Sequence, residues 1–298
     1  MTINATERRT AVRERYARAA TTGDGCCGPS DCGAPSNGPD PTAATATAAP
    51  ASPTTTADEI SCAVGYDQDE LSRVPEGANL GLGCGNPVAL ASLAPGETVL
   101  DLGSGAGFDC FLAAERVGPT GRVVGVDMTP EMLEKARANA LSGGFANVEF
   151  RLGEIEALPV ADASVDAIIS NCVLNLSADR PRVLAEAMRV LRPGGRVMIS
   201  DLVSDRPMPD FVANSQESLV GCLPVGIAEY QADLAAAGFT AIGVEKRQRY
   251  PSEHILSDPR VQEVIRRDPA LAAEVHSFVE SIHGGTIQAV RPGGTKEG

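Results

Sequence analysis

From about residue 97 onward, short apolar segments alternate with amphipathic segments, and this alternation constrains the fold more than any other feature. The predicted strands are ETVLDLG (97–103), GRVVGVDM (121–128), NVEFRLG (147–153), VDAIISNCV (165–173) and GRVMISDLV (195–203). Helices are predicted between them at 109–117, 129–141 and 181–191, and a further helix and strand at 229–247. Strands that alternate with helices predict an α/β fold with a doubly wound, mostly parallel sheet.

The rest of the chain divides by composition. Residues 1–33 are expected to form an N-terminal helix followed by a cysteine-rich segment. Residues 34–58 are almost entirely Ala, Pro, Thr and Ser. A segment of this composition cannot bury a hydrophobic core, so it is predicted to be a disordered linker. We expect the main domain at 59–205 and a further C-terminal region, with a small extension, at 206–298.

Charge and hydropathy narrow the classes of partner. The formal net charge of −14 repels phosphate backbones, so nucleic acid is not an expected partner. No segment approaches the length of a membrane span, and the charged N-terminus lacks the apolar centre of a signal peptide. The expected location is therefore cytoplasmic, where the eight cysteines stay reduced and are available for metal, metalloid or redox chemistry.

A glycine-rich loop follows the first predicted strand. It runs from Asp101 through Gly103, Ser104 and Gly105 to Gly107, and glycines there let the backbone approach a ligand at the carboxyl end of the sheet. An acidic residue, Asp127, ends the next strand, where it can accept both ribose hydroxyls of an adenosine. The sequence therefore predicts an adenosine-containing cofactor at this loop.

The spacing of the loop favours one cofactor over another. A dinucleotide fingerprint requires Gly or Ala three residues after its second glycine, and Phe108 stands there. The loop instead resembles the G-x-G-x-G loop of class I S-adenosylmethionine (SAM) methyltransferases. An NAD enzyme and glycines that serve only a tight turn remain alternatives. By this resemblance, the other predicted cofactor-binding residues are Met128, Gly153, Glu154, Ile155 and Asn171.

Three cysteines stand where they can converge above that cofactor. Cys172 ends the fourth strand, Cys62 lies ahead of the first strand, and Cys222 follows the fifth strand. A single cysteine often only packs in the core, but three at the carboxyl edge of one sheet indicate a shared site.

The chain from Tyr66 to about Phe239 resembles the arsenite SAM methyltransferases. The runs that carry the resemblance are VPEGANLGLGCGNPVA, VLDLGSGAGFDCFLAAERVG, GVDMTPEMLEKARANA, NVEFRLGEIEALPV, IISNCVLNLS and RVLRPGGRVMISDLV. The resemblance implies a class I Rossmann-like methyltransferase fold, with the SAM site in 59–205 and arsenic binding extending into 206–298. It also implies that Cys62, Cys172 and Cys222 bind As(III), with Cys26 and Cys27 as candidate upstream ligands. Cys84 is interpreted as structural.

The implied chemistry suits these residues. As(III) is thiophilic, and three thiolates leave its lone pair free to attack the sulfonium methyl without a general base. The implied substrates are arsenite, its thiol adducts and methylated As(III), and turnover requires a thiol reductant, either glutathione or thioredoxin. The implied role is arsenic detoxification.

Two other functions remain open from the sequence. One is a SAM methyltransferase of a small carbon or oxygen acceptor, which leaves the three cysteines unexplained. The other is a protein that sequesters As(III) without methyl transfer. A zinc site is not favoured, because the usual paired Cys-x-x-Cys clusters are absent from the sequence.

Overall fold

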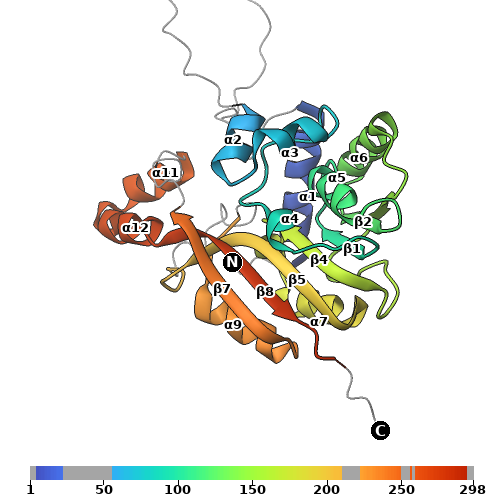
Figure 1. The fold of residues 1–298 in the computed structure, drawn as a ribbon. Coiled ribbons are helices and arrows are strands. Elements are labelled where there is room, and N and C mark those ends of the chain that lie inside the picture. The colour runs from blue at the N-terminus through green and yellow to red at the C-terminus, as the bar shows by residue number, and fades with distance from the viewer. Residues whose placement is uncertain (1–4, 23–55, 210–221, 250–255, 257–258, 294–298) are drawn as a thin grey trace, which may run out of the picture.

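The structure is a computed structural model that describes residues 5–22, 56–209, 222–249, 256 and 259–293 (Figure 1). Cys26, Cys27 and most of the linker predicted at 34–58 lie outside the described residues. The last two residues of that predicted linker begin a helix, α2 (Ala57–Ala63), which Thr56 caps by accepting the N–H of Glu59.

The described residues form one central eight-stranded sheet, with strand order β3-β2-β1-β4-β5-β8-β7 and β6 paired to β5. The strands β1 to β5 are parallel, whereas β8 runs antiparallel to both β5 and β7. Their bounds are β1 Thr98–Leu102, β2 Arg122–Asp127, β3 Val148–Leu152, β4 Val165–Asn171, β5 Leu191–Ser204, β6 Val225–Gly226, β7 Thr240–Arg249 and β8 Ile282–Val290. The predicted doubly wound, mostly parallel sheet is confirmed.

Helices cover both faces of the sheet (Figure 1). Alternate residues of β1 supply the two cores, because successive side chains of a strand point to opposite faces. Val99 packs with α4, α5 and α6, and Leu100 packs with α7 and α9. The bounds of these helices are α4 Pro87–Leu90, α5 Phe108–Val117, α6 Pro130–Gly143, α7 Arg180–Val190 and α9 Ile227–Ala236.

The start of α6 shows how the sequence positions the carboxyl edge of the sheet. Thr129 and Pro130 begin the helix as the sequence predicts, but the Thr129 side chain makes no capping hydrogen bond. Instead, the Thr129 N–H donates to Oδ1 of Asp127 at 2.8 Å. The helix start thus fixes an acidic side chain at the end of β2.

The remaining elements lie at the two ends of the chain. Helix α1 (Ala5–Thr22) packs against α6, and the short helix α3 (Gln68–Arg73) follows α2. Near the C-terminus, α11 (Pro259–Arg267) and α12 (Ala272–Val279) precede β8, which completes the sheet between β5 and β7. The domain boundary at 205/206 stays a prediction.

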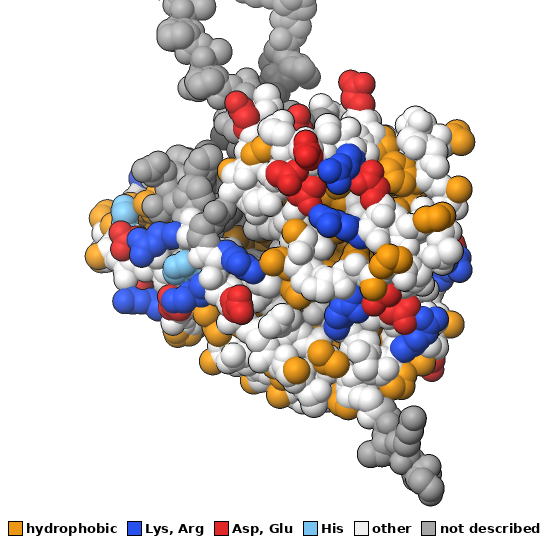
Figure 2. All heavy atoms as spheres, viewed as in Figure 1, with side chains coloured by type: hydrophobic (Ala, Val, Ile, Leu, Met, Phe, Trp, Pro, Cys, Tyr) orange, Lys and Arg blue, Asp and Glu red, His pale blue; other side chains and the backbone are white. Residues whose placement is uncertain are grey.

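The described surface is mixed in character. Figure 2 shows acidic and basic side chains interspersed over one face, with Lys and Arg side chains gathered near α11 and α12. Among the described residues, none of the helices has the length and apolar character that crossing a membrane requires.

Candidate active site

The strand order reverses between β1 and β4, and a crevice opens at the carboxyl ends of these two strands. The loop after β1 turns there through three glycines in the left-handed region, Gly103 (φ 70°), Gly105 (φ 52°) and Gly107 (φ 96°). Side chains other than glycine rarely adopt this conformation. The glycines therefore bring the main chain to the edge of the crevice.

A cavity with an empty volume of about 1080 Å³, its open mouth included, occupies this crevice. Most of the predicted cofactor-binding residues line it, namely Asp101, Gly103, Ser104, Gly105, Asp127, Met128, Gly153, Ile155 and Asn171. Gly107 and Glu154 are not in the lining. Gly107 is the N-cap residue of α5, and Glu154 forms an ion pair with Arg9 of α1.

Asp127 is oriented by main-chain donors. Its Oδ2 accepts the N–H of Gly105 at 3.0 Å, and its Oδ1 accepts the N–H of Thr129. Burial raises the pKa of Asp127, and these backbone hydrogen bonds oppose that rise. These hydrogen bonds fix the carboxylate at the cavity wall, where its oxygens can also accept from a hydroxyl group of a ligand.

Two further carboxyl groups lie in the floor of the cavity. Burial raises the pKa of Asp101 well above its usual range, with a further rise from the charge of Asp109, and the thiol of Cys110 donates to Asp101 at 3.2 Å. Burial also raises the pKa of Asp109 to about 6, against hydrogen bonds from Tyr66 and Asn171. A cationic ligand in this cavity would stabilise the ionised form of both carboxyl groups.

These features fit SAM. Within the described part of the chain, the buried hydroxyl of Ser104 has no hydrogen-bond partner, so it can bond to a ligand. The acidic side chain of Asp127 suits a ribose, and the buried carboxyl groups of Asp101 and Asp109 suit a ligand with ammonium and sulfonium charges.

Helix α1 contributes to this cavity, which the sequence analysis did not predict. Arg9, Val12 and Tyr16 line the cavity, and Tyr16 packs with Met132 of α6. Arg8 donates to the carbonyl groups of Asn175 and Leu176, in the 3-10 helix that follows Cys172. The available signal was the spacing of Val12, Tyr16, Ala19 and Ala20, which places four apolar or small residues on one helical face.

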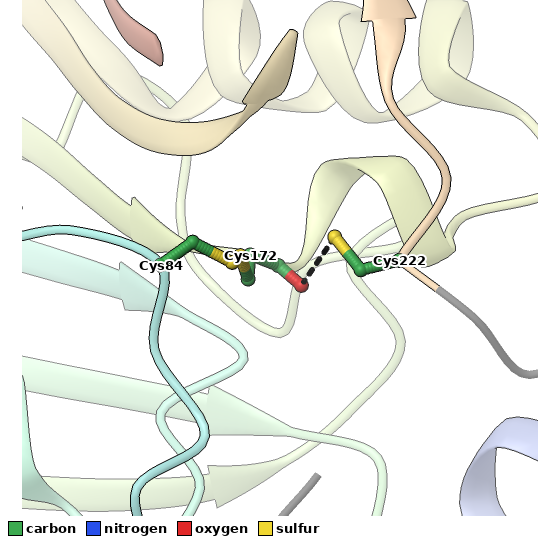
Figure 3. Close-up of side chains that lie close together, drawn as sticks. All are labelled: Cys84, Cys172 and Cys222. Carbon is green, nitrogen blue, oxygen red and sulfur yellow. Dashed lines mark hydrogen bonds between the residues drawn. A yellow bond between two sulfur atoms is a disulfide. The ribbon is translucent and has the colours of Figure 1, made fainter. Parts of the chain in front are cut away.

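The side chains of Cys84, Cys172 and Cys222 lie close together (Figure 3). The sulfur atoms of Cys84, Cys172 and Cys222 all lie within 4.8 Å of one another. Cys84 and Cys172 are joined by a disulfide, with Cα atoms 5.7 Å apart. Cys172 also lines the cavity, so the sulfur group adjoins the place proposed for the cofactor.

Cys62, the predicted third sulfur, lies outside this group. It is on α2, and its Sγ accepts a hydrogen bond from Gln68 at 3.0 Å. Cys84 lies in the group instead, and its main-chain N–H donates to Oδ1 of Asn171 at 2.8 Å. A residue interpreted as structural from the sequence therefore lies in the sulfur group.

Cys172 and Cys222 differ in their local surroundings. Cys172 has φ 58°, a left-handed conformation that is uncommon for residues with a side chain and turns the chain sharply at the end of β4. The Cys222 thiol donates to Oδ1 of the buried Asp201 at 3.3 Å and lies 4.0 Å from the carbonyl oxygen of Cys172. Leu202, Phe278 and Ile282 form an apolar wall against Cys84 and Cys222.

Comparison with known proteins finds similarity to methyltransferases. The model of a methyltransferase-domain family matches residues 93–251. An arsenite methyltransferase from Halobacterium salinarum is 51% identical over 254 residues, which cover 85% of this chain and 62% of that protein. An arsenite methyltransferase from Aquipseudomonas alcaligenes is 41% identical over 216 residues, 69% of this chain and 58% of that protein. The chain thus spans less than two thirds of the length of these two relatives.

A solved structure is also similar over most of its length. CrArsM, an arsenic(III) S-adenosylmethionine methyltransferase from Chlamydomonas reinhardtii, is 31% identical with a TM-score of 0.55. The similarity covers 82% of this chain and 75% of that one.

Proposed function

The chain belongs to the methyltransferase-domain family and, within it, to the arsenite SAM methyltransferases, and from this premise we propose that it methylates trivalent arsenic. The substrates are arsenite and methylated As(III), free or as thiol adducts. The observation that carries the proposal is the group of sulfur atoms from Cys84, Cys172 and Cys222 at the edge of a cavity that fits SAM.

The three thiolates hold arsenic. Each As–S bond forms as a cysteine thiol displaces a hydroxyl group of arsenite, and the thiol proton leaves with that hydroxyl group as water. Three sulfurs around As(III) leave one lone pair directed away from them. Soft thiolate ligands suit this soft centre.

Bound SAM supplies an electrophilic methyl group on a sulfonium sulfur. The contribution of the chain is positioning, which lowers the barrier by several kcal/mol when the reacting atoms are held close and aligned. Asp127 and Ser104 orient the adenosine, and Cys172 holds arsenic at the cavity wall. No general base is needed, because the arsenic lone pair carries no proton.

The pair of Cys84 and Cys172 also fits the electron balance. Donation of the lone pair to carbon oxidises arsenic by two electrons, and two thiolates that couple as a disulfide return two electrons. The disulfide between Cys84 and Cys172 is the product that such a coupling leaves. A thiol reductant, glutathione or thioredoxin, then restores both thiols for the next turnover.

Arsenic speciation tests the proposal. The reduced protein is incubated with arsenite, SAM and glutathione, and the products are separated by chromatography. We expect methylated arsenic from the wild type and at most about one hundredth of it from Cys172→Ser, because loss of a positioned ligand removes most of the rate advantage. Methylated arsenic from Cys172→Ser at the wild-type rate would overturn the proposal. Tight As(III) binding without any methylated product in the wild type would instead indicate sequestration.

A further inference from the structure

The side chain of Asn171 joins the end of β4 to the segment that carries Cys84. Its Oδ1 accepts the N–H of Cys84 at 2.8 Å, and its Nδ2 donates to the carbonyl of Gly85 at 2.7 Å. The same Nδ2 lies 2.8 Å from the hydroxyl oxygen of Tyr66 and 3.1 Å from Oδ2 of Asp109, so its two N–H groups are shared among three acceptors. Both ends of the amide are therefore used to hold main chain and buried polar groups.

The segment of Cys84 lies directly against this amide. A Cβ atom added to Gly83 would be 2.6 Å from Nδ2 of Asn171, and one added to Gly85 would be 2.9 Å from the side chain of Ser200. Neither glycine has a positive φ. The close approach, and not the backbone conformation, is therefore what excludes a side chain at these positions.

The other end of the network lies in the cofactor cavity. The Tyr66 hydroxyl donates to Oδ1 of Asp109 at 2.6 Å, and both side chains are buried and line the cavity. Asn171 also lines the cavity. The cavity wall and the main chain of Cys84 thus share one hydrogen-bonded unit.

We propose that Asn171 is a positioning residue that holds Cys84 within reach of Cys172 and fixes the two sulfurs relative to the cofactor cavity. Cys84 lies in no helix or strand, so the backbone hydrogen bonds of such elements do not fix its position. The side-chain hydrogen bonds from Asn171 and the contact with Gly83 do so instead. This inference deepens the proposed function and rests on it for its catalytic meaning, but its direct consequence concerns the thiols alone.

The consequence is a high effective concentration of one thiol at the other. In exchange with glutathione, the two protein thiols and glutathione disulfide give the Cys84–Cys172 disulfide and two glutathione thiols. The equilibrium constant of this exchange measures how well the chain holds the two sulfurs together. It can be measured with no arsenic and no SAM present.

The experiment compares this constant in the full-length wild type, Asn171→Ala and Gly83→Ala, by alkylation of thiols and mass spectrometry of the Cys84 and Cys172 peptides. Asn171→Ala removes the amide, whereas Gly83→Ala keeps it and displaces it. We expect both variants to lower the constant about tenfold or more, the change that corresponds to one lost net hydrogen bond. The ultraviolet absorption of the As(III)–thiolate complex should weaken in parallel.

Asn147→Ala is the matched control. Its Nδ2 also donates to two main-chain carbonyl groups, those of Ala114 and Gly118, but it precedes β3, an edge strand that β2 and β1 separate from β4. It should keep the wild-type exchange constant. If Asn171→Ala does not fold, Gly83→Ala alone decides the question.

The inference is overturned if the folded variants keep the constant within about twofold of the wild type, a change below one hydrogen bond. It is also overturned if Asn147→Ala lowers the constant equally. A lowered constant in a protein that makes no methylated arsenic would reject the proposed function and retain the positioning role. An unchanged constant in a protein that does make methylated arsenic would reject only the positioning role.

Discussion

The thiol of Cys222 donates a hydrogen bond to the buried carboxyl group of Asp201, with 3.3 Å between Sγ and Oδ1. Burial raises the pKa of Asp201 to about 7, and the hydrogen bonds from Cys222, Leu202 and Asn175 only partly oppose this rise. The native protein therefore holds a proton on Asp201 at a pH where the unfolded chain has released it.

The first prediction concerns the pH dependence of stability. Because the folded pKa of Asp201 lies above the unfolded value near 4, the free energy of unfolding falls as the pH rises through the range from about 4 to about 7. Asp201→Asn removes this contribution. Its stability relative to the wild type should rise by about 2 kcal/mol between pH 5 and pH 8. Denaturant unfolding of both reduced proteins at the two pH values measures the difference.

A relative stability of Asp201→Asn that does not change between these pH values would contradict the account of Asp201. Asp109, whose pKa burial raises to about 6, adds a similar slope to both proteins. The comparison between wild type and variant therefore isolates Asp201.

The second prediction separates Cys84 from Cys62. Cys84→Ser should lower the rate of arsenite methylation at least about a hundredfold, because the third sulfur ligand of arsenic is lost. It should retain more of the activity on monomethylated As(III), since a methyl group already occupies one position of that substrate. Initial rates with each substrate provide the measurement.

Cys62→Ser is the matched control, with the same change at a cysteine outside the sulfur group. It should keep both rates near the wild-type values. Loss of both activities in Cys62→Ser, with Cys84→Ser active, would return the third sulfur to Cys62.

The third prediction tests the cofactor site. Asp127→Asn keeps the size of the side chain but replaces one acceptor of the carboxylate with an amide donor. The dissociation constant of SAM should rise about tenfold or more, because a hydrogen bond to a charged group is lost. Calorimetry measures this constant. Asp162→Asn, an exposed acidic residue paired with Arg189, should leave it unchanged; equal effects of the two substitutions would exclude a specific role for Asp127.

The fourth prediction concerns α1 as part of the cavity. Val12 is 2% exposed and lines the cavity, so Val12→Asp places an unpaired carboxylate in an apolar contact. We expect α1 to leave the cavity and SAM affinity to fall about tenfold or more, as for other buried unpaired charges. Arg13→Asp, at the exposed neighbouring position, should keep the affinity of the wild type. A SAM affinity in Val12→Asp equal to that of the wild type would show that α1 does not contribute to SAM binding.

Much of the fold could be predicted from local sequence. The buried strands and the helix start at Thr129 and Pro130 depend on periodicity and capping residues that neighbouring positions reveal. The place of β8 between β5 and β7 could not be predicted in this way, since it depends on pairing between Ser204 and Ile282, far apart in the chain. Such non-local pairing leaves no local pattern.

The candidate site, like the fold, could be predicted only where it depends on local sequence. The glycine loop and Asp127 follow directly from two strands and their ends, so their place at the carboxyl edge could be predicted. The proximity of Cys84 to Cys172 and Cys222 could not, because the three residues are far apart in the chain and Cys84 lies outside the helices and strands. The contribution of α1 depends on how its apolar face docks on α6, which the helix alone does not determine.

The coordination of arsenic tests the central claim most directly. X-ray absorption at the arsenic edge, on the reduced protein with one equivalent of As(III), counts the sulfur neighbours of the metalloid. We predict three sulfur neighbours in the wild type and in Cys62→Ser, and two in Cys84→Ser, in Cys172→Ser and in Cys222→Ser. Three sulfur neighbours in Cys84→Ser together with two in Cys62→Ser would contradict the site described by the structure.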